Sequence, residues 1–164
     1  MHLKKNLINY WKNMKYISGD LIQLAKEGKF DVIVHGCNCF NTMGSGIAKQ
    51  IKENYPVAWE VDQSTEKGGR HKLGKFTMAM YDPIVINAYI QYDYGRDGKD
   101  RFEYEAFEMI LDKLWLRYPN ARFGFPYIGC GLAGGDEAKI VDMLKDFDRK
   151  IRFYGGSVTL VKYE

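Results

Sequence analysis

Two glycine-rich loops constrain the fold of this chain more than any other feature of its sequence. Loop one, HGCNCFNTMGSGI, spans residues 35–47, and loop two, IGCGLAGGD, spans residues 128–136. Each loop follows an apolar run and precedes a segment with helical periodicity, so each is predicted to connect a strand to a helix. Two such connections are typical of an α/β sheet whose ligands bind at the carboxyl ends of the strands.

The rest of the chain alternates predicted strands and helices in the same manner. Strands are predicted at residues 15–18, 32–35, 76–80, 84–90, 122–128 and 157–163, and helices at residues 21–26, 46–55, 100–118 and 136–147. Pro56 is expected to end the second helix, and the polar residues 63–74 to form a surface loop. The alternation predicts one α/β domain, residues 14–164, with a parallel or mixed sheet covered on both faces. Residues 1–13 are interpreted as an N-terminal extension.

The composition agrees with one ordered domain and indicates the cellular compartment. The chain has 164 residues, with 17 glycines and only 4 prolines, which indicates backbone bends inside a fold rather than a flexible linker. A net charge of +3 is too small to indicate nucleic acid binding by itself. Three cysteines, without an apolar run long enough for a secretory signal or a membrane span, predict a reducing, cytoplasmic setting.

The two loops are candidate phosphate sites. Glycines allow the backbone to approach a ligand closely, and the start of a helix adds N–H donors and a partial positive charge. Two such cradles at one sheet edge would suit a diphosphate or a dinucleotide-like ligand. The alternative is that the glycines serve only as tight turns. Seven of the 17 glycines lie in these loops: Gly36, Gly44, Gly46, Gly129, Gly131, Gly134 and Gly135.

Other motifs in the chain are weaker. The GxGxxG match at residues 129–134 lies too close to the end of the chain for a dinucleotide-binding domain, and GxxxxGK at residues 69–75 lacks the Ser or Thr of an NTPase loop. No Arg follows a cysteine at the spacing of a cysteine phosphatase, and His35, Cys37 and Cys39 lack a second ligand pair for zinc. We therefore predict no metal and no cofactor.

Three polar side chains beside the glycines are candidates for chemistry. His35 can act as an acid or base near neutral pH, or it can be a hydrogen-bonded residue at a strand end. Asp136 can orient water or a sugar hydroxyl, or it can be the N-cap of the following helix. The Asn38 amide can hold a ribose hydroxyl or merely a turn. Residue spacing alone leaves these alternatives open.

The chain resembles the macro domain family, the ADP-ribose-binding α/β/α module, over residues 14–163. The resemblance is carried by SGDL at residues 18–21, HGCNCFNTMGSGIA at residues 35–48 and FPYIGCGLAGGD at residues 125–136. The two loops are most similar to the branch that contains ADP-ribose 1''-phosphate phosphatases of the yeast and phage type. This resemblance implies a three-layer α/β/α fold with a mixed central sheet.

The resemblance also implies roles for single residues. It places Asp20 on the adenine amino group, Leu21 beside the ring, Tyr163 in a stack with adenine, and Asn38 on the distal ribose. Tyr163 can equally be an ordinary edge-strand tyrosine. The diphosphate would lie between two groups of loop residues: Gly44, Ser45, Gly46 and Ile47 from loop one, and Gly129, Cys130, Gly131, Leu132 and Ala133 from loop two.

The implied activity is hydrolysis of ADP-ribose 1''-phosphate, with His35, Asp136 and Asn38 as catalytic residues. Many family members have Asn where His35 stands. Residues 89–93 hold no lysine and Ala133 stands where some glycohydrolases have Asp, so a lysyl-adduct mechanism is not expected. Glu137 replaces a frequent Trp at the pocket rim. The alternatives are an ADP-ribosyl hydrolase acting on protein or nucleic acid, and a non-catalytic ADP-ribose reader. We expect a monomer that requires neither nucleic acid nor a membrane.

Overall fold

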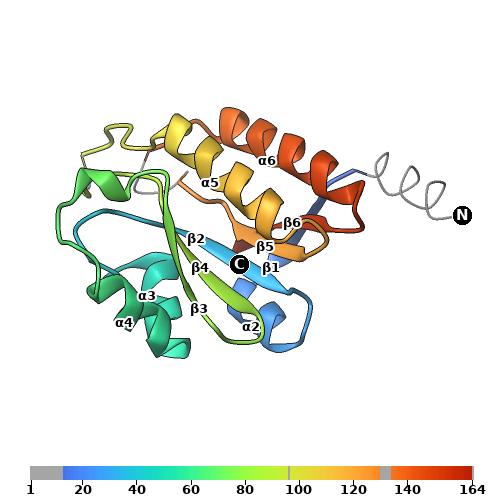
Figure 1. Ribbon diagram of the computed structural model, residues 1–164, viewed down its shortest axis with the longest axis horizontal. Coiled ribbons are helices and arrows are strands. Elements are labelled where there is room, and N and C mark those ends of the chain that lie inside the picture. The colour runs from blue at the N-terminus through green and yellow to red at the C-terminus, as the bar shows by residue number, and fades with distance from the viewer. Residues whose placement is uncertain (1–12, 96, 130–133, 164) are drawn as a thin grey trace, which may run out of the picture.

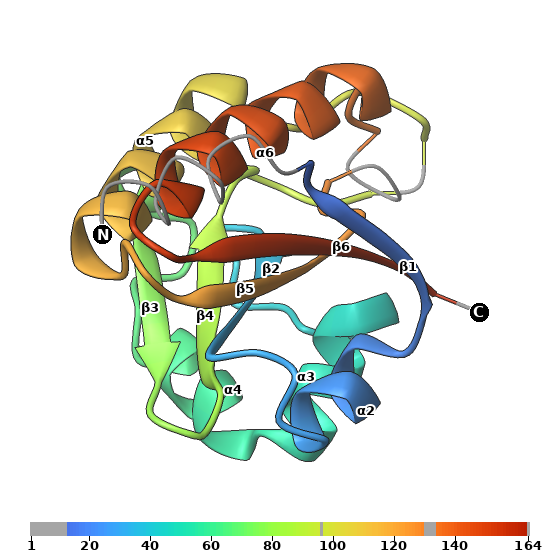
Figure 2. The same cartoon turned by 90° about the vertical axis from the view of Figure 1, so that its right-hand side faces the viewer.

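The protein folds as a six-stranded sheet between two layers of helices. The computed structural model describes residues 13–95, 97–129 and 134–163. Helices α5 and α6 cover one face of the sheet and α2, α3 and α4 cover the other (Figures 1 and 2). Strand order is β1-β6-β5-β2-β4-β3, and every pair is parallel except β3 with β4. The predicted α/β fold with a mixed central sheet is confirmed.

The observed elements follow the predicted order. The strands are β1 (Lys15–Gly19), β2 (Val32–Cys37), β3 (Phe76–Ala79), β4 (Ile84–Tyr89), β5 (Arg122–Pro126) and β6 (Ser157–Tyr163). The helices are α2 (Leu21–Lys26), α3 (Gly46–Asn54), α4 (Pro56–Gln63), α5 (Tyr104–Arg117) and α6 (Glu137–Arg152), with a short 3₁₀ turn, η1 (Arg70–Lys72). Within the described residues, no helix has the length and apolar character needed to cross a membrane.

Helix α3 ends before Pro56, as predicted, but helix α4 was not predicted. Tyr55 closes α3 and is at the same time the N-cap of α4, whose first residue is Pro56. Proline is favoured at this position because its fixed φ suits a helix and its missing N–H is not needed in the first turn. Pro56 therefore ends one helix and begins the next.

Helices α5 and α6 differ from the prediction at their ends. Residues before Tyr104 are extended, because Phe102 pairs with Gln91 in an isolated bridge and the Glu103 N–H donates to the Ile90 carbonyl at 2.7 Å. At the other end, α6 continues to Arg152 because its buried face includes Ile151 beyond the predicted end at residue 147. The start of α5 and the end of α6 therefore differ from the prediction because of strand pairing and burial that form only in the folded chain.

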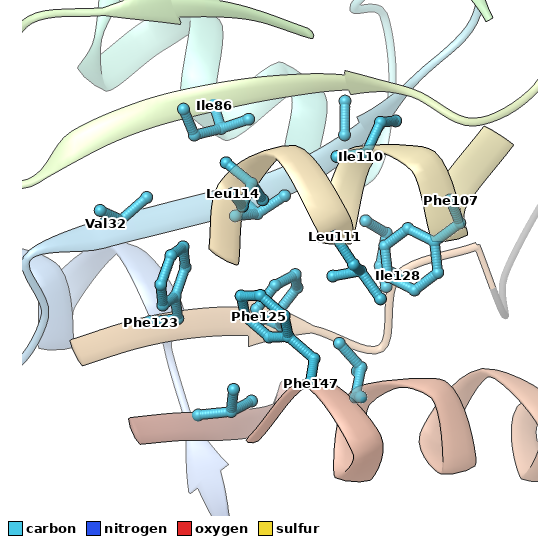
Figure 3. Close-up of a cluster of buried hydrophobic side chains, with 14 of the residues drawn as sticks. Val32, Ile86, Phe107, Ile110, Leu111, Leu114, Phe123, Phe125, Ile128 and Phe147 are labelled. Atoms are coloured by element: carbon cyan, nitrogen blue, oxygen red, sulfur yellow. The ribbon is translucent and has the colours of Figure 1, made fainter. Parts of the chain in front are cut away.

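The main core lies between the sheet and helices α5 and α6. Alternation along β2 sends Val32 and Val34 into this layer, whereas Ile33 packs with the helices of the opposite face. In Figure 3, Leu114 of α5 and Phe147 of α6 lie among side chains from β2, β4 and β5. Both faces of the central strands are thus buried, as expected for a parallel sheet.

A buried ion pair fastens α6 to the sheet. The Arg152 Nε atom lies 2.6 Å from Asp148 Oδ2, and both side chains are at most 5% exposed. Asp148 Oδ1 accepts a hydrogen bond from the Val158 N–H of β6, and Arg152 Nη2 donates to the Asn13 carbonyl. Asn13 is the one residue of the predicted N-terminal extension that is described; residues 1–12 lie outside the described part of the chain.

Replacing Leu114 by Ala should destabilise the domain by about 2 to 5 kcal/mol, because this side chain is fully buried between α5 and the sheet. Leu116→Ala is the matched control on the same helix, since Leu116 is 74% exposed. Urea unfolding of both variants would measure the difference. Equal losses of unfolding free energy would contradict the packing described.

Candidate functional site

The parallel strands end together at one edge of the sheet, and a pocket lies there. The cavity has a volume of about 550 Å³. Three chain segments form its walls: loop one, the start of loop two, and the connection from β4 to α5. Six of the predicted ligand-binding residues line it: Asn38, Gly44, Ser45, Gly46, Ile47 and Gly129.

Helix α3 opens at the pocket with an uncapped first turn. Its N-cap residue, Ser45, makes no side-chain capping hydrogen bond, and Gly46 and Ile47 of the first turn line the pocket. By contrast, Asp20 caps α2 and Asp136 caps α6 with their carboxylates. The N-terminal N–H groups of α3 are therefore available to an anion in the pocket.

Asn38 lines the pocket, but its amide hydrogen bonds hold loop one. Its Oδ1 accepts from the Phe40 N–H at 2.8 Å, and its Nδ2 donates to Thr42 Oγ1 at 2.6 Å and to the Thr42 carbonyl at 3.3 Å. Both Nδ2 hydrogens are thus engaged. The structure therefore shows the turn-holding contacts of Asn38, and its predicted contact with a ribose stays a prediction.

A buried lysine, Lys72, holds loop one through hydrogen bonds. Lys72 is 4% exposed, and its Nζ donates to Asn41 Oδ1 at 2.6 Å and to the Cys39 and Glu66 carbonyls at 3.1 Å. Asn41 has a φ of +58°, a conformation that costs free energy in a non-glycine residue. Residues 63–74 were predicted as a surface loop. A lysine in a polar stretch carries no sequence signal of burial, because lysine is almost always exposed.

Only the ends of loop two are described. Cys130, Gly131, Leu132 and Ala133 lie outside the described residues. Gly129 has a φ of +73°, and a side chain there would collide with the Phe102 ring, so this position requires glycine. The loop closes where the Gly135 N–H donates to the Gly129 carbonyl at 2.8 Å.

Asp136 stands at the outer end of loop two. Its Oδ1 accepts from the Lys139 N–H at 3.3 Å, which makes it the N-cap of α6, and its own N–H donates to the Tyr104 hydroxyl at 3.0 Å. The side chain is exposed and is not part of the pocket wall. It follows Gly135, which bonds to Gly129 of the wall. Asp136 thus lies near the pocket rim and combines the capping role with a solvent-facing carboxylate.

His35 lies beneath the pocket rather than in its wall. The ring is 1% exposed, and its Nε2 lies 2.6 Å from Asn87 Oδ1. Because the Asn87 amide nitrogen donates to the Ala58 carbonyl and to Thr77 Oγ1, its oxygen is the acceptor and His35 Nε2 carries the hydrogen. Burial lowers the pKa of His35 to about 4, so the ring is neutral at pH 7.

These contacts do not support the predicted role of His35 as a catalytic acid. A histidine that acts as a general acid must reach the atom that it protonates and must be in its charged imidazolium form at the working pH. His35 meets neither condition in this structure. The described geometry instead supports the alternative of a hydrogen-bonded histidine that holds β2 to β4. The structure thus does not bring His35 and Asp136 together in the pocket.

The thiols at loop one are unsuited to nucleophilic attack. Burial is the main cause of the raised pKa of both the Cys37 and the Cys39 thiol, so the reactive thiolate is disfavoured. Among the described residues, no three His, Cys, Asp or Glu side chains form a group that could hold a metal ion.

The residues predicted to hold adenine lie farther along the same sheet edge. Gly19 at the end of β1 is in register with Tyr163 at the end of β6, so Asp20 and Tyr163 are neighbours. Both capping bonds of Asp20, from the Ile22 and Gln23 N–H groups, go to Oδ1. Tyr163 is 67% exposed. Leu21 is 3% exposed and packs in the core. The order along the edge is the one the predicted ligand orientation requires, and the contacts with adenine stay predictions.

The third wall of the pocket was not predicted from the sequence. Gln91, Tyr94 and Gly95, from the connection between β4 and α5, line the cavity. A signal was present: the run QYDYG follows the predicted strand at residues 84–90, and residues after a parallel strand belong to the ligand edge. No glycine cluster marked it, so the segment was not assigned.

The fold and the pocket define a three-layer α/β/α domain whose ligand site is built by strand-to-helix loops at one sheet edge. No protein-family model matches the chain. A relative from Enterobacteria phage T4, named the uncharacterized 17.5 kDa protein in the tk-vs intergenic region, is 34% identical over 84% of this chain and 92% of the relative. The ADP-ribose 1''-phosphate phosphatase of Aspergillus oryzae is 40% identical over 52 residues, which are 32% of this chain and 24% of that protein.

Solved structures show the same fold. The macrodomain of Mycobacterium tuberculosis DarG is 21% identical with a TM-score of 0.69, covering 92% of this chain and 96% of that chain. Thermosipho africanus DarTG in complex with ADP-ribose is 16% identical with a TM-score of 0.68, covering 92% of this chain and 43% of that chain. The chain therefore has the macrodomain fold, and part of its sequence is similar to ADP-ribose 1''-phosphate phosphatases.

Acid should destabilise the protein partly through His35. Its folded pKa of about 4 lies below the value of 6.5 that it regains on unfolding, so the unfolded state binds the extra proton as pH falls. The resulting loss begins near pH 6.5, is complete near pH 4 and amounts to about 3 kcal/mol at most. In His35→Gln this contribution is absent, so the free energy of unfolding should fall less steeply over that range. Parallel curves for the two proteins in urea titrations would exclude the assigned neutral ring.

Proposed function

We propose that this domain binds ADP-ribose and hydrolyses ADP-ribose 1''-phosphate to ADP-ribose and phosphate. The observation that carries the proposal is the uncapped N-terminus of α3, which presents its N–H groups to a cavity lined by Gly44, Gly46 and Gly129. Such a site suits an anion. The names of partial relatives and of the structural neighbour in complex with ADP-ribose add support for this ligand.

The strand order gives the proposed ligand its direction. An extended ligand with its diphosphate between loop one and loop two would direct one end toward β6 and β1, and the other toward β4. Asp20 and Tyr163 at the first end suit an adenine, because a carboxylate accepts from its amino group and a phenol ring stacks on it. The distal ribose would then lie between loop one and the β4–α5 connection.

The proposed reaction needs no group other than water and this chain. Water attacks the phosphorus, the bond from phosphorus to the ribose 1'' oxygen breaks, and that oxygen takes a proton from solvent. Loop N–H groups stabilise the charge that develops on the phosphate oxygens. Asp136, near the rim and solvent-facing, orients the water and takes its proton. Asn38 keeps loop one in the shape that presents these donors.

Ser45→Asp tests the anion site. Aspartate is a strong N-cap, so the variant should fold with unchanged or higher stability while its carboxylate occupies and repels the anion position. We expect the Kd for ADP-ribose to rise at least tenfold, measured by calorimetry with thermal unfolding in parallel. Ser45→Ala, which leaves the N–H groups free, is the control and should bind within about threefold of wild type. Unchanged affinity in Ser45→Asp would contradict the proposed site.

Phosphate release from ADP-ribose 1''-phosphate tests the reaction. Asp136→Asn keeps the cap of α6 and removes the base, so kcat should fall more than tenfold while the Kd for ADP-ribose changes less than threefold. His35→Gln should retain kcat within about threefold; a loss above tenfold at unchanged stability would restore His35 as a proton donor. Release of ADP-ribose from modified protein or nucleic acid, without phosphate release, would favour the hydrolase alternative. Binding without any turnover would identify a reader.

A further inference from the structure

Hydrogen bonds tie the described part of the connection between β4 and α5 to neighbouring segments. The connection is the yellow-green loop at the upper left of Figure 1. The Tyr92 carbonyl accepts from the Cys39 N–H of loop one at 2.8 Å, and the Tyr92 hydroxyl donates to the Gly68 carbonyl at 3.0 Å. This wall of the pocket is therefore joined directly to loop one at Tyr92.

Arg101 forms ion pairs with two aspartates of this segment, Asp93 and Asp97, and we call these contacts the Arg101 clasp. Its Nη1 and Nη2 atoms meet the two carboxylate oxygens of Asp97 at 2.6 and 2.9 Å, and its Nε donates to Asp93 Oδ1 at 2.9 Å. The guanidinium is shielded, with the Arg101 side chain 13% exposed. Gly95 lies against it so closely that a Cβ there would be 2.7 Å from Nη2. A bidentate pair of this kind fixes orientation as well as distance.

Tyr94 lies in the chain between Asp93 and Asp97, the two residues that Arg101 binds. It is 59% exposed and yet lines the pocket, and its ring centroid lies 6.4 Å from that of Phe40 in loop one. An aromatic ring that is exposed in the free protein and faces a cavity gains most from burial when a ligand covers it. Because the Arg101 contacts hold Asp93 and Asp97 before a ligand binds, less conformational entropy is lost on binding than for a free loop.

The strand order indicates which part of the proposed ligand Tyr94 would contact. Strand β4 lies on the side of β2 opposite to β5, β6 and β1. A residue that follows β4 is therefore separated from Asp20 and Tyr163 by the two phosphate loops. With the diphosphate between those loops, as in the proposed function, Tyr94 stands at the end where the distal sugar lies.

We infer that Tyr94 is a specificity-determining residue that packs against the distal ribose, and that Arg101 is the positioning residue that holds it there. This inference rests on the proposed function. The sugar has an apolar C–H face that an aromatic ring can cover, whereas ADP lacks this sugar. Tyr94 therefore contributes to the recognition of ADP-ribose and not to that of ADP.

Binding of ADP-ribose and ADP to the same variants tests the role of Tyr94. Tyr94→Ala should weaken ADP-ribose at least tenfold and change ADP less than twofold, while Tyr94→Phe, which keeps the ring, should bind ADP-ribose within threefold of wild type. Tyr154→Ala removes a tyrosine that is 50% exposed outside the pocket, and should change neither ligand. Equal effects of Tyr94→Ala on both ligands, or none, overturn the inference. Wild-type protein that binds neither ligand would instead refute the proposed function.

A double-mutant cycle tests the role of Arg101. Arg101→Gln should weaken ADP-ribose, but not ADP, about as much as Tyr94→Ala does, and the double variant should be no weaker than either single variant. A merely structural arginine would lower the thermal midpoint and affect both ligands alike. Additive losses in the double variant, or a loss shared by ADP, would show that Arg101 does not act through Tyr94.

Discussion

The parallel pairing of β2 with β5 on one side and β4 on the other is the constraint on which the rest of the structure depends. Val32 is in register with Phe123 of β5 and with Ile84 of β4. Because the three strands run the same way, the segments after them must emerge at the same edge. Burial on both faces fixes this register, since a slip of one residue along β2 would exchange Val34 and His35 between the two helix layers.

Polar side chains with filled hydrogen bonds support the loops that form the pocket at that edge. Lys72 and Asn38 hold loop one, and Arg101 holds the opposite wall. His35 and Asn87 bridge β2 and β4 beneath. In each case a polar group has its hydrogen bonds filled by the loops or strands that it supports. Such satisfied networks give rigidity, which favours ligand binding by reducing the ordering cost.

The elements with a clear hydrophobic period were predictable, and those set by contacts elsewhere were not. Helix α2 matches its prediction because Asp20 and the following apolar residues form a local cap and face. The start of α5 does not, because the bridge from Phe102 to Gln91 forms only when the chain folds back. Loop one was identified by its glycines. Tyr94 was not, since its place in the wall depends on β4 lying next to β2.

Sequence alone determined the fold class and two of the three segments that form the pocket, because those depend on periodicity, glycine positions and local capping. Tertiary structure decided what the side chains do. It buried Lys72 and His35, left the first turn of α3 open to the pocket, and brought Tyr94 beside Phe40. Burial, proton affinity and proximity depend on which distant segments surround a group, and no spacing along the chain encodes that directly.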